Sequence, residues 1–130
     1  MSWVHDTLAD YGRRIGIERL DFGSHGVAQL QLESGGLVAV EPVEREGQDE
    51  VLVYIGRPAG HDAGRVYAAA LAKAHHSHGG PFALQVALRG HGPEALLLAL
   101  TRLPERSFTP QTLAHAVDHL RRWLDEVHGR

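Results

Sequence analysis

The order in which the hydrophobic period changes along the chain limits its fold more than any other feature. Three segments repeat apolar residues with the period of a helix, and five others are strand-like. The helical segments are residues 3–15, 62–78 and 109–127, and the strand-like segments lie near 27–32, 37–42, 51–56, 82–88 and 95–102. This order, α-β-β-β-α-β-β-α, predicts a single two-layer α+β domain over residues 1–130, with helices covering a twisted antiparallel sheet. No long loop is left to carry an elaborate active site.

Local signals support several of these elements. Thr109 followed by Pro110 is a strong start signal for the last helix, and Asp62 is a good N-cap for the second. The tripeptide at residues 34–36, Ser-Gly-Gly, predicts a tight hairpin. The polar, acidic stretch 43–50 predicts a solvated loop. Strands 51–55 and 95–101 are apolar on both faces, so each is either covered on both sides or partly exposed for a partner.

Composition argues against several classes of protein. The 130 residues contain no cysteine, so neither a disulfide nor a thiolate metal site can form, and a reducing cytoplasm suits the chain. A net charge of −3 argues against nucleic acid as a partner. The longest apolar run, Ala95 to Leu100, is far shorter than a membrane helix. Because the N-terminus lacks a basic start and an unbroken apolar run, we expect no signal peptide.

Ten histidines raise the possibility of a metal site. The densest group, residues 75–78, ends the second helix, where imidazoles also suit the helix dipole and the free carbonyl groups. No carboxylate lies in that segment to complete a metal site. His115 and His119 are four residues apart, but the residue after His115 is not the glutamate of a zinc peptidase. We therefore predict a solvated face there and no bound metal, with a metal-binding domain as the weaker alternative.

Residues for catalysis are also missing. None of the five serines lies in a Gly-x-Ser-x-Gly motif, and residues 56–60 lack the lysine and spacing of a phosphate-binding loop. The acidic residues of the predicted 43–50 loop have no apolar pocket in the sequence pattern that would raise a pKa. We predict that the protein is not an enzyme and uses no cofactor.

The second helix is small and apolar on all sides. Ala68, Ala69 and Ala72 lie outside its main stripe, which is formed by residues 66, 67, 70, 71 and 74. Small residues permit close approach of a second backbone, which favours a helix–helix contact between subunits. A helix of simply high propensity explains the same composition. Both interpretations stay open at this point.

Three further patterns resemble one family. They are the stretch Tyr67-Ala-Ala-Ala-Leu71-Ala-Lys-Ala-His75, the pair Gly79-Gly80-Pro81-Phe82-Ala-Leu84 and Ala95-Leu-Leu-Leu-Ala-Leu100, and the closing Phe108-Thr-Pro-Gln-Thr-Leu113 with Leu120-Arg-Arg-Trp123-Leu124. Together with the order of the elements, they resemble the class I type III secretion chaperones, the Tir-chaperone family. The resemblance extends over essentially the whole chain.

This resemblance implies a cytoplasmic, ATP-independent homodimer that binds the N-terminal region of a secreted effector in extended form. The secretion-system ATPase is a further candidate partner. Carried onto this chain, the effector-binding residues are Val4, Leu8, Tyr11, Leu30, Val38, Val40, Val51 and Val53. The dimer-interface residues are Tyr67, Ala70, Leu71, Ala74, Leu84 and Val86. For any single one of these residues, an ordinary place in the core explains the pattern as well.

The alternative function is a structural or regulatory adaptor of the same fold that serves no effector. On the chaperone hypothesis, Val53→Asp is expected to abolish binding of the partner while leaving the dimer intact.

Overall fold

The computed structural model describes residues 2–16, 26–31, 36–76, 82–90 and 94–127. It contains the three helices and five strands predicted, in the predicted order, so the α+β fold class is confirmed. The helices are α1 (Ser2–Arg14), α2 (Ala63–His76) and α3 (Pro110–Val127), with a short 3₁₀ helix η2 at Glu105–Ser107. The strands are β1 (Ala28–Gln31), β2 (Leu37–Arg45), β3 (Gln48–Pro58), β4 (Gln85–Arg89) and β5 (Leu96–Pro104).

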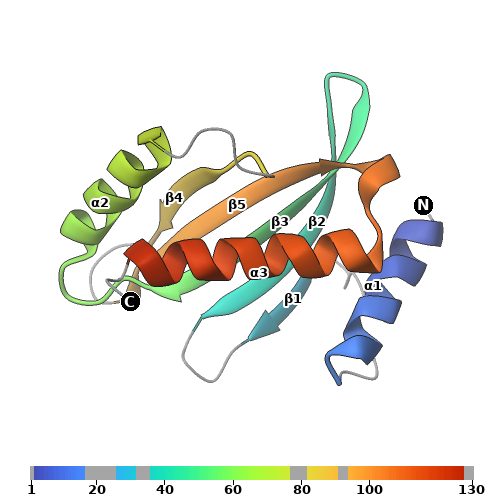
Figure 1. The fold of residues 1–130 in the computed structure, drawn as a ribbon, viewed down its shortest axis with the longest axis horizontal. Coiled ribbons are helices and arrows are strands. Elements are labelled where there is room, and N and C mark those ends of the chain that lie inside the picture. The colour runs from blue at the N-terminus through green and yellow to red at the C-terminus, as the bar shows by residue number, and fades with distance from the viewer. Residues whose placement is uncertain (1, 17–25, 32–35, 77–81, 91–93, 128–130) are drawn as a thin grey trace.

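The five strands form one antiparallel sheet in the order β1-β2-β3-β5-β4. Figure 1 shows α3 crossing one face of this sheet, with α1 near its N-terminal end and α2 at the opposite end beside β4. The predicted hairpin turn at residues 34–36 lies largely outside the described residues, but β1 and β2 do pair antiparallel. The sheet therefore has β1 and β4 at its two edges.

The main core lies between α3 and the sheet. Alternate residues of neighbouring strands point toward the helix, and the register places Val40 opposite Val53, and Val53 opposite Thr101. All three are at most 3% exposed. Helix α3 supplies Leu113, Leu120 and Leu124, each fully buried against these strands.

A second, smaller apolar cluster lies on the opposite face of the sheet. Its buried members are Leu37, Ala39, Tyr54 and Leu98, with Leu52 and Leu100 partly buried beside them. The presence of an apolar cluster on each face of the sheet explains why β3 and β5 are apolar on both faces. Val53 belongs to the helix-covered core, whereas its neighbour Tyr54 belongs to the second cluster.

Residues 43–50 form a β-hairpin rather than the predicted loop, although residues 44–49 are exposed as predicted. β2 continues to Arg45 and β3 begins at Gln48, and the hairpin projects beyond the rest of the sheet (Figure 1). The two turn residues, Glu46 and Gly47, have φ angles of 52° and 77°. Positive φ at both positions is the geometry of the tightest hairpin turn, whose twist matches that of the strands.

Helix α3 is anchored at both ends. At its start, the Thr109 hydroxyl accepts a hydrogen bond from the Thr112 N–H at 3.0 Å, which confirms the predicted N-cap. Near its end, Asp125 pairs with Arg57 of β3 at 2.6 Å and Glu126 pairs with Lys73 of α2 at 3.0 Å. These contacts tie the helix to the sheet and to α2.

In the described part of the chain, no helix combines the length and hydropathy needed to cross a lipid bilayer.

Candidate functional site

An apolar pocket of about 40 Å³ opens between α1 and the first hairpin of the sheet. Its floor is made by two cross-strand pairs, Ala28 with Val40 and Leu30 with Val38. Its other side is made by three residues that follow one another along the inner face of α1 and its end, namely Leu8, Tyr11 and Ile15. The spacing of three and four residues brings these side chains to one stripe of the helix. The lining is almost wholly apolar.

Two features make this pocket accessible. Ile15 is 44% exposed, one of only two large hydrophobic side chains in the described ranges that are this exposed. Beside the pocket, β1 pairs only with β2 among the strands that the structure describes, so its outer edge presents backbone N–H and C=O groups for a further strand. Burial raises the pKa of Tyr11, which keeps the phenol neutral in this apolar setting.

The structure brings five of the eight predicted effector-binding residues to this pocket: Leu8, Tyr11, Leu30, Val38 and Val40. The other three, Val4, Val51 and Val53, are fully buried in the main core and do not line it. An aspartate at Val53 would therefore place an unpaired carboxylate in the core, so we expect Val53→Asp to unfold the protein rather than affect binding alone. Sequence reasoning missed Ala28 and Ile15 as lining residues, although Ile15 follows Tyr11 by four positions.

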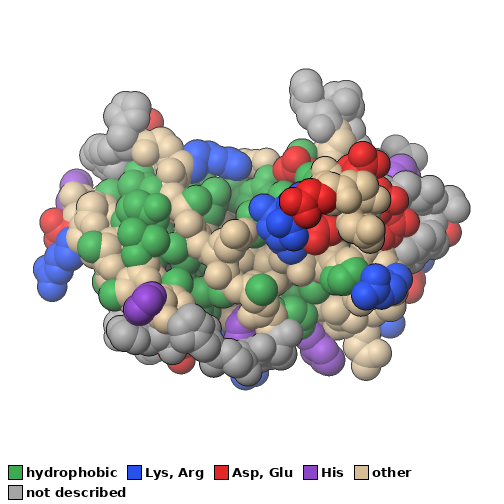
Figure 2. All heavy atoms as spheres, turned by 90° about the horizontal axis from the view of Figure 1, so that it is seen from above, with side chains coloured by type: hydrophobic (Ala, Val, Ile, Leu, Met, Phe, Trp, Pro, Cys, Tyr) green, Lys and Arg blue, Asp and Glu red, His purple; other side chains and the backbone are tan. Residues whose placement is uncertain are grey.

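The predicted dimer residues lie on α2, on β4 and just before β4. Ala70 is fully buried against the body of the protein, while Tyr67, Ala74, Leu84 and Val86 are partly buried. Leu71 faces outward and is 45% exposed, with alanines 68, 69 and 72 exposed around it. Figure 2 shows hydrophobic side chains gathered at the end of the molecule where α2 and β4 lie. The outward face of α2 is thus apolar and made of small residues.

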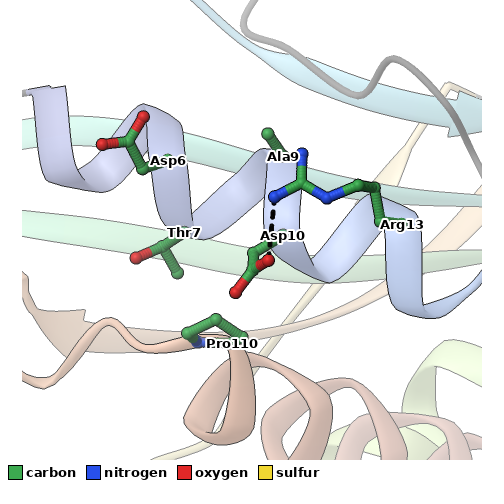
Figure 3. A pocket seen from close by; sticks show the side chains of 6 residues that line it. All are labelled: Asp6, Thr7, Ala9, Asp10, Arg13 and Pro110. Atoms are coloured by element: carbon green, nitrogen blue, oxygen red, sulfur yellow. Dashed lines mark hydrogen bonds and ion pairs between the residues drawn. The ribbon is translucent and has the colours of Figure 1, made fainter.

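A second, more open hollow lies between α1 and the start of α3 (Figure 3). Three of its polar side chains already have partners. Asp10 pairs with Arg13 at 2.9 Å, and the Thr7 hydroxyl donates to the Phe108 carbonyl oxygen at 3.4 Å. In Figure 3, Thr7 and Asp10 point toward Pro110. A carboxylate neutralised by arginine and a hydroxyl bonded to the backbone are poor candidates for acid–base chemistry.

The histidines do not converge. Within the described ranges, no group of three or more His, Asp or Glu side chains is placed to hold a metal ion. His75 is exposed at the end of α2, and His78 lies outside the described residues. The face of α3 carrying His115 and His119 is less solvated than predicted, because His119 is partly buried against Phe82 with ring centroids 5.5 Å apart.

The decisive comparison is with a family model. The model described as type III secretory system chaperone SycN matches residues 3–128. The chain belongs to this chaperone family. The family resemblance inferred from the sequence is therefore confirmed, and membership in a non-catalytic family agrees with the prediction that the protein is not an enzyme. A search of curated proteins found no match.

Solved structures show the same fold. A chain of the ExsC–ExsE complex aligns with a TM-score of 0.68 at 20% identity, covering 95% of this chain and 92% of that one. The Yersinia pestis type III secretion chaperone SycH, solved with a fragment of YscM2, gives 0.66 at 14% identity and coverages of 95% and 98%. The HopA1–SchA chaperone–effector complex gives 0.63 at 16% identity and coverages of 96% and 92%.

Proposed function

We propose that this chaperone binds the N-terminal region of a secreted effector in extended form and keeps it soluble and competent for secretion. The observation that carries this proposal is the apolar pocket between α1 and β1–β2, beside the open edge of β1. The structurally similar chaperone SycH was solved in complex with a fragment of YscM2, and SchA was solved in a chaperone–effector complex with HopA1.

The geometry suits strand addition. An extended segment can pair with the outer edge of β1 through main-chain hydrogen bonds, while one of its apolar side chains enters the pocket formed by Leu8, Tyr11 and Ile15. Main-chain pairing supplies affinity that does not depend on sequence, and the pocket supplies selectivity. Val4, Val51 and Val53 then act as the rigid support beneath the pocket rather than as contact residues.

We also propose a homodimer formed through the outward face of α2 and the neighbouring β4. The apolar surface around Leu71 supports this, since an exposed leucine among alanines is a favourable centre for close helix packing. The chaperone would act in the cytoplasm without nucleotide and hand its effector to the secretion-system ATPase.

Ile15→Asp tests the binding mode, because this side chain lines the pocket and is exposed enough for the fold to tolerate a charge. Tagged chaperone is purified from secreting cells without added nucleotide, and the effector that accompanies it is trimmed by protease to the protected segment. Titration calorimetry then compares that segment with wild type and variant. We expect roughly tenfold weaker binding, the value of one buried apolar contact.

Leu71→Asp is the matched control, since Leu71 is equally exposed but lies on α2. It should leave the affinity of each chaperone subunit for the segment unchanged. Equal affinity of wild type and Ile15→Asp would contradict the proposed pocket. If no exported protein accompanies the wild-type chain, an adaptor role replaces the chaperone role.

A further inference from the structure

The apolar pocket between α1 and β1–β2 is small, and its size limits what can enter it. Its volume is about 40 Å³. A volume of about 10–15 Å³ holds one water molecule, and an engineered apolar cavity of about 150 Å³ holds a benzene ring. The pocket therefore has room for about three groups of the size of a methyl group. An isopropyl group fits this space, and an aromatic ring does not.

Most of the wall of this pocket is packed from behind by the rest of the protein. Leu8 is fully buried, and Tyr11, Ala28 and Val40 are at most 7% exposed. Ile15 is the one exposed residue of the lining, and the others are buried or half-buried. Because a close-packed interior yields little, a larger side chain could enter only by displacing core atoms, which is costly.

Ala28 is the lining residue that leaves the space unfilled. It is the smallest side chain of the lining, and it lies on β1 directly opposite Val40. The next residue of β1 on the same face, Leu30, carries a much larger side chain. Extra carbon atoms at position 28 would extend into the pocket. The size of the pocket is therefore set largely by Ala28.

The alternation of β1 also limits the residues that flank the one in the pocket. A segment that pairs with the outer edge of β1 places successive side chains on opposite faces of the sheet. One face is that of Ala28 and Leu30, which line the pocket. The other face is that of Gln29 and Gln31, which are both exposed. Polar side chains suit the positions of the segment that lie beside these glutamines.

We propose that the pocket selects one branched aliphatic side chain, that of valine, leucine or isoleucine, from an extended effector segment with polar residues on either side of it, and that Ala28 sets this limit. The inference rests on the proposed function, because it names the side chain that the effector pocket accepts. A phenylalanine or tryptophan ring is too large for the space. Threonine has the shape of valine, but its hydroxyl would lose its water in an almost wholly apolar lining.

The probe is the protease-protected effector segment that is purified with the wild-type chain, synthesised as peptides with one apolar residue changed at a time. The pocket position is the one whose change to alanine is non-additive with Ile15→Asp in a double-mutant cycle. Titration calorimetry then compares valine, leucine, threonine and phenylalanine at that position. We expect valine and leucine to bind within about threefold of each other, and threonine and phenylalanine to bind roughly tenfold more weakly.

Two variants of the chaperone should change this preference in opposite directions. Ala28→Val fills part of the pocket and should weaken binding of the leucine peptide roughly tenfold, while the alanine peptide binds as to wild type. Leu30→Ala enlarges the pocket and should bring the phenylalanine peptide at least to the affinity of the leucine peptide. Gln29→Ala, on the other face of β1, is the matched control and should keep the wild-type order. Melting temperatures measured in parallel show that each variant is folded.

The outcomes separate this proposal from the one on which it rests. Equal affinity of wild type for the leucine and phenylalanine peptides, or an unchanged order in Leu30→Ala, overturns the selection by size. Equal affinity for the valine and threonine peptides overturns the selection for an aliphatic group. In both cases the effector pocket stands as long as Ile15→Asp weakens binding. If Ile15→Asp has no effect, the proposed binding mode fails, and this inference fails with it.

Discussion

The phenol of Tyr11 links the apolar pocket to the stability of the fold. Burial raises its pKa above the usual 10.0, because the phenolate is poorly solvated among Leu8 and Val40. Between its unfolded and its folded pKa, the unfolded chain has lost the proton and the folded chain retains it. The contribution to stability is therefore complete below about pH 10 and declines as the pH rises further, by up to about 1.4 kcal/mol per pH unit.

Tyr11→Phe should remove this part of the alkaline decline, as measured by urea unfolding at several values above pH 9. Tyr67→Phe leaves the buried phenol in place and should unfold with the same alkaline decline as wild type. A Tyr11→Phe profile that falls as steeply as that of Tyr67→Phe would show that the Tyr11 phenol is not the group responsible.

Single positions differ in how far the sequence determines them. The Thr109 cap is a local signal and was predictable, because the hydroxyl and the free N–H groups lie within three residues. The exposure of Leu71 was not predictable. Periodicity places Leu71 on the same stripe as Ala70, but it does not show how much of that stripe is covered by the rest of the protein. The same holds for Val53, whose burial depends on which face of the sheet α3 covers.

Among the elements, the projecting β2–β3 hairpin carries a local conflict. Its turn places Glu46 at a φ of 52°, the only positive φ of a non-glycine residue among those described. The register also sets Glu44 directly opposite Asp49, and like charges at opposed positions destabilise a strand pair. By contrast, Arg45 pairs with Glu50 at 3.0 Å on the other side of the hairpin.

Glu46→Asn should stabilise the protein by about 0.5 kcal/mol, because Asn-Gly is the preferred pair for this turn and asparagine tolerates positive φ. The free energy of unfolding in urea measures the effect. Glu46→Gln is the matched control, since it removes the same charge but keeps a side chain that disfavours this backbone. If both variants gain equally, charge repulsion rather than backbone strain limits the hairpin.

The hairpin also shows why the elements were only partly predictable. The Glu46-Gly47 turn gives a weaker signal than Asn-Gly, and the polar residues around it lack the apolar alternation of a strand. The pairing is instead an extension of the β2–β3 ladder that begins at Leu37 and Gly56. A strand that grows from an established ladder needs little propensity of its own.

At the scale of the whole molecule, the fold persists at 14–20% identity to the solved chaperones. Order and period survive such divergence, because many apolar residues fill one core equally well. The order of elements could therefore be predicted from the sequence, whereas the binding surfaces could be predicted only in part. The pocket beside α1 depends on the angle between a helix and a hairpin, which no local pattern encodes.

Assembly gives a test at this scale. A homodimer couples folding to association, so the melting temperature of the wild-type protein should rise with protein concentration, by a few degrees per hundredfold. Leu71→Asp puts a charge on the outward face of α2, where an unpaired carboxylate in a subunit interface is costly. For the Leu71→Asp variant, multi-angle light scattering should give the monomer mass of 14.2 kDa. Its melting temperature should not depend on protein concentration. Ile15→Asp changes a residue at the end of α1 and leaves the face of α2 intact, so this variant should keep the dimer mass. A wild-type chain that is monomeric at every concentration would contradict the homodimer and leave the face of α2 for a different partner.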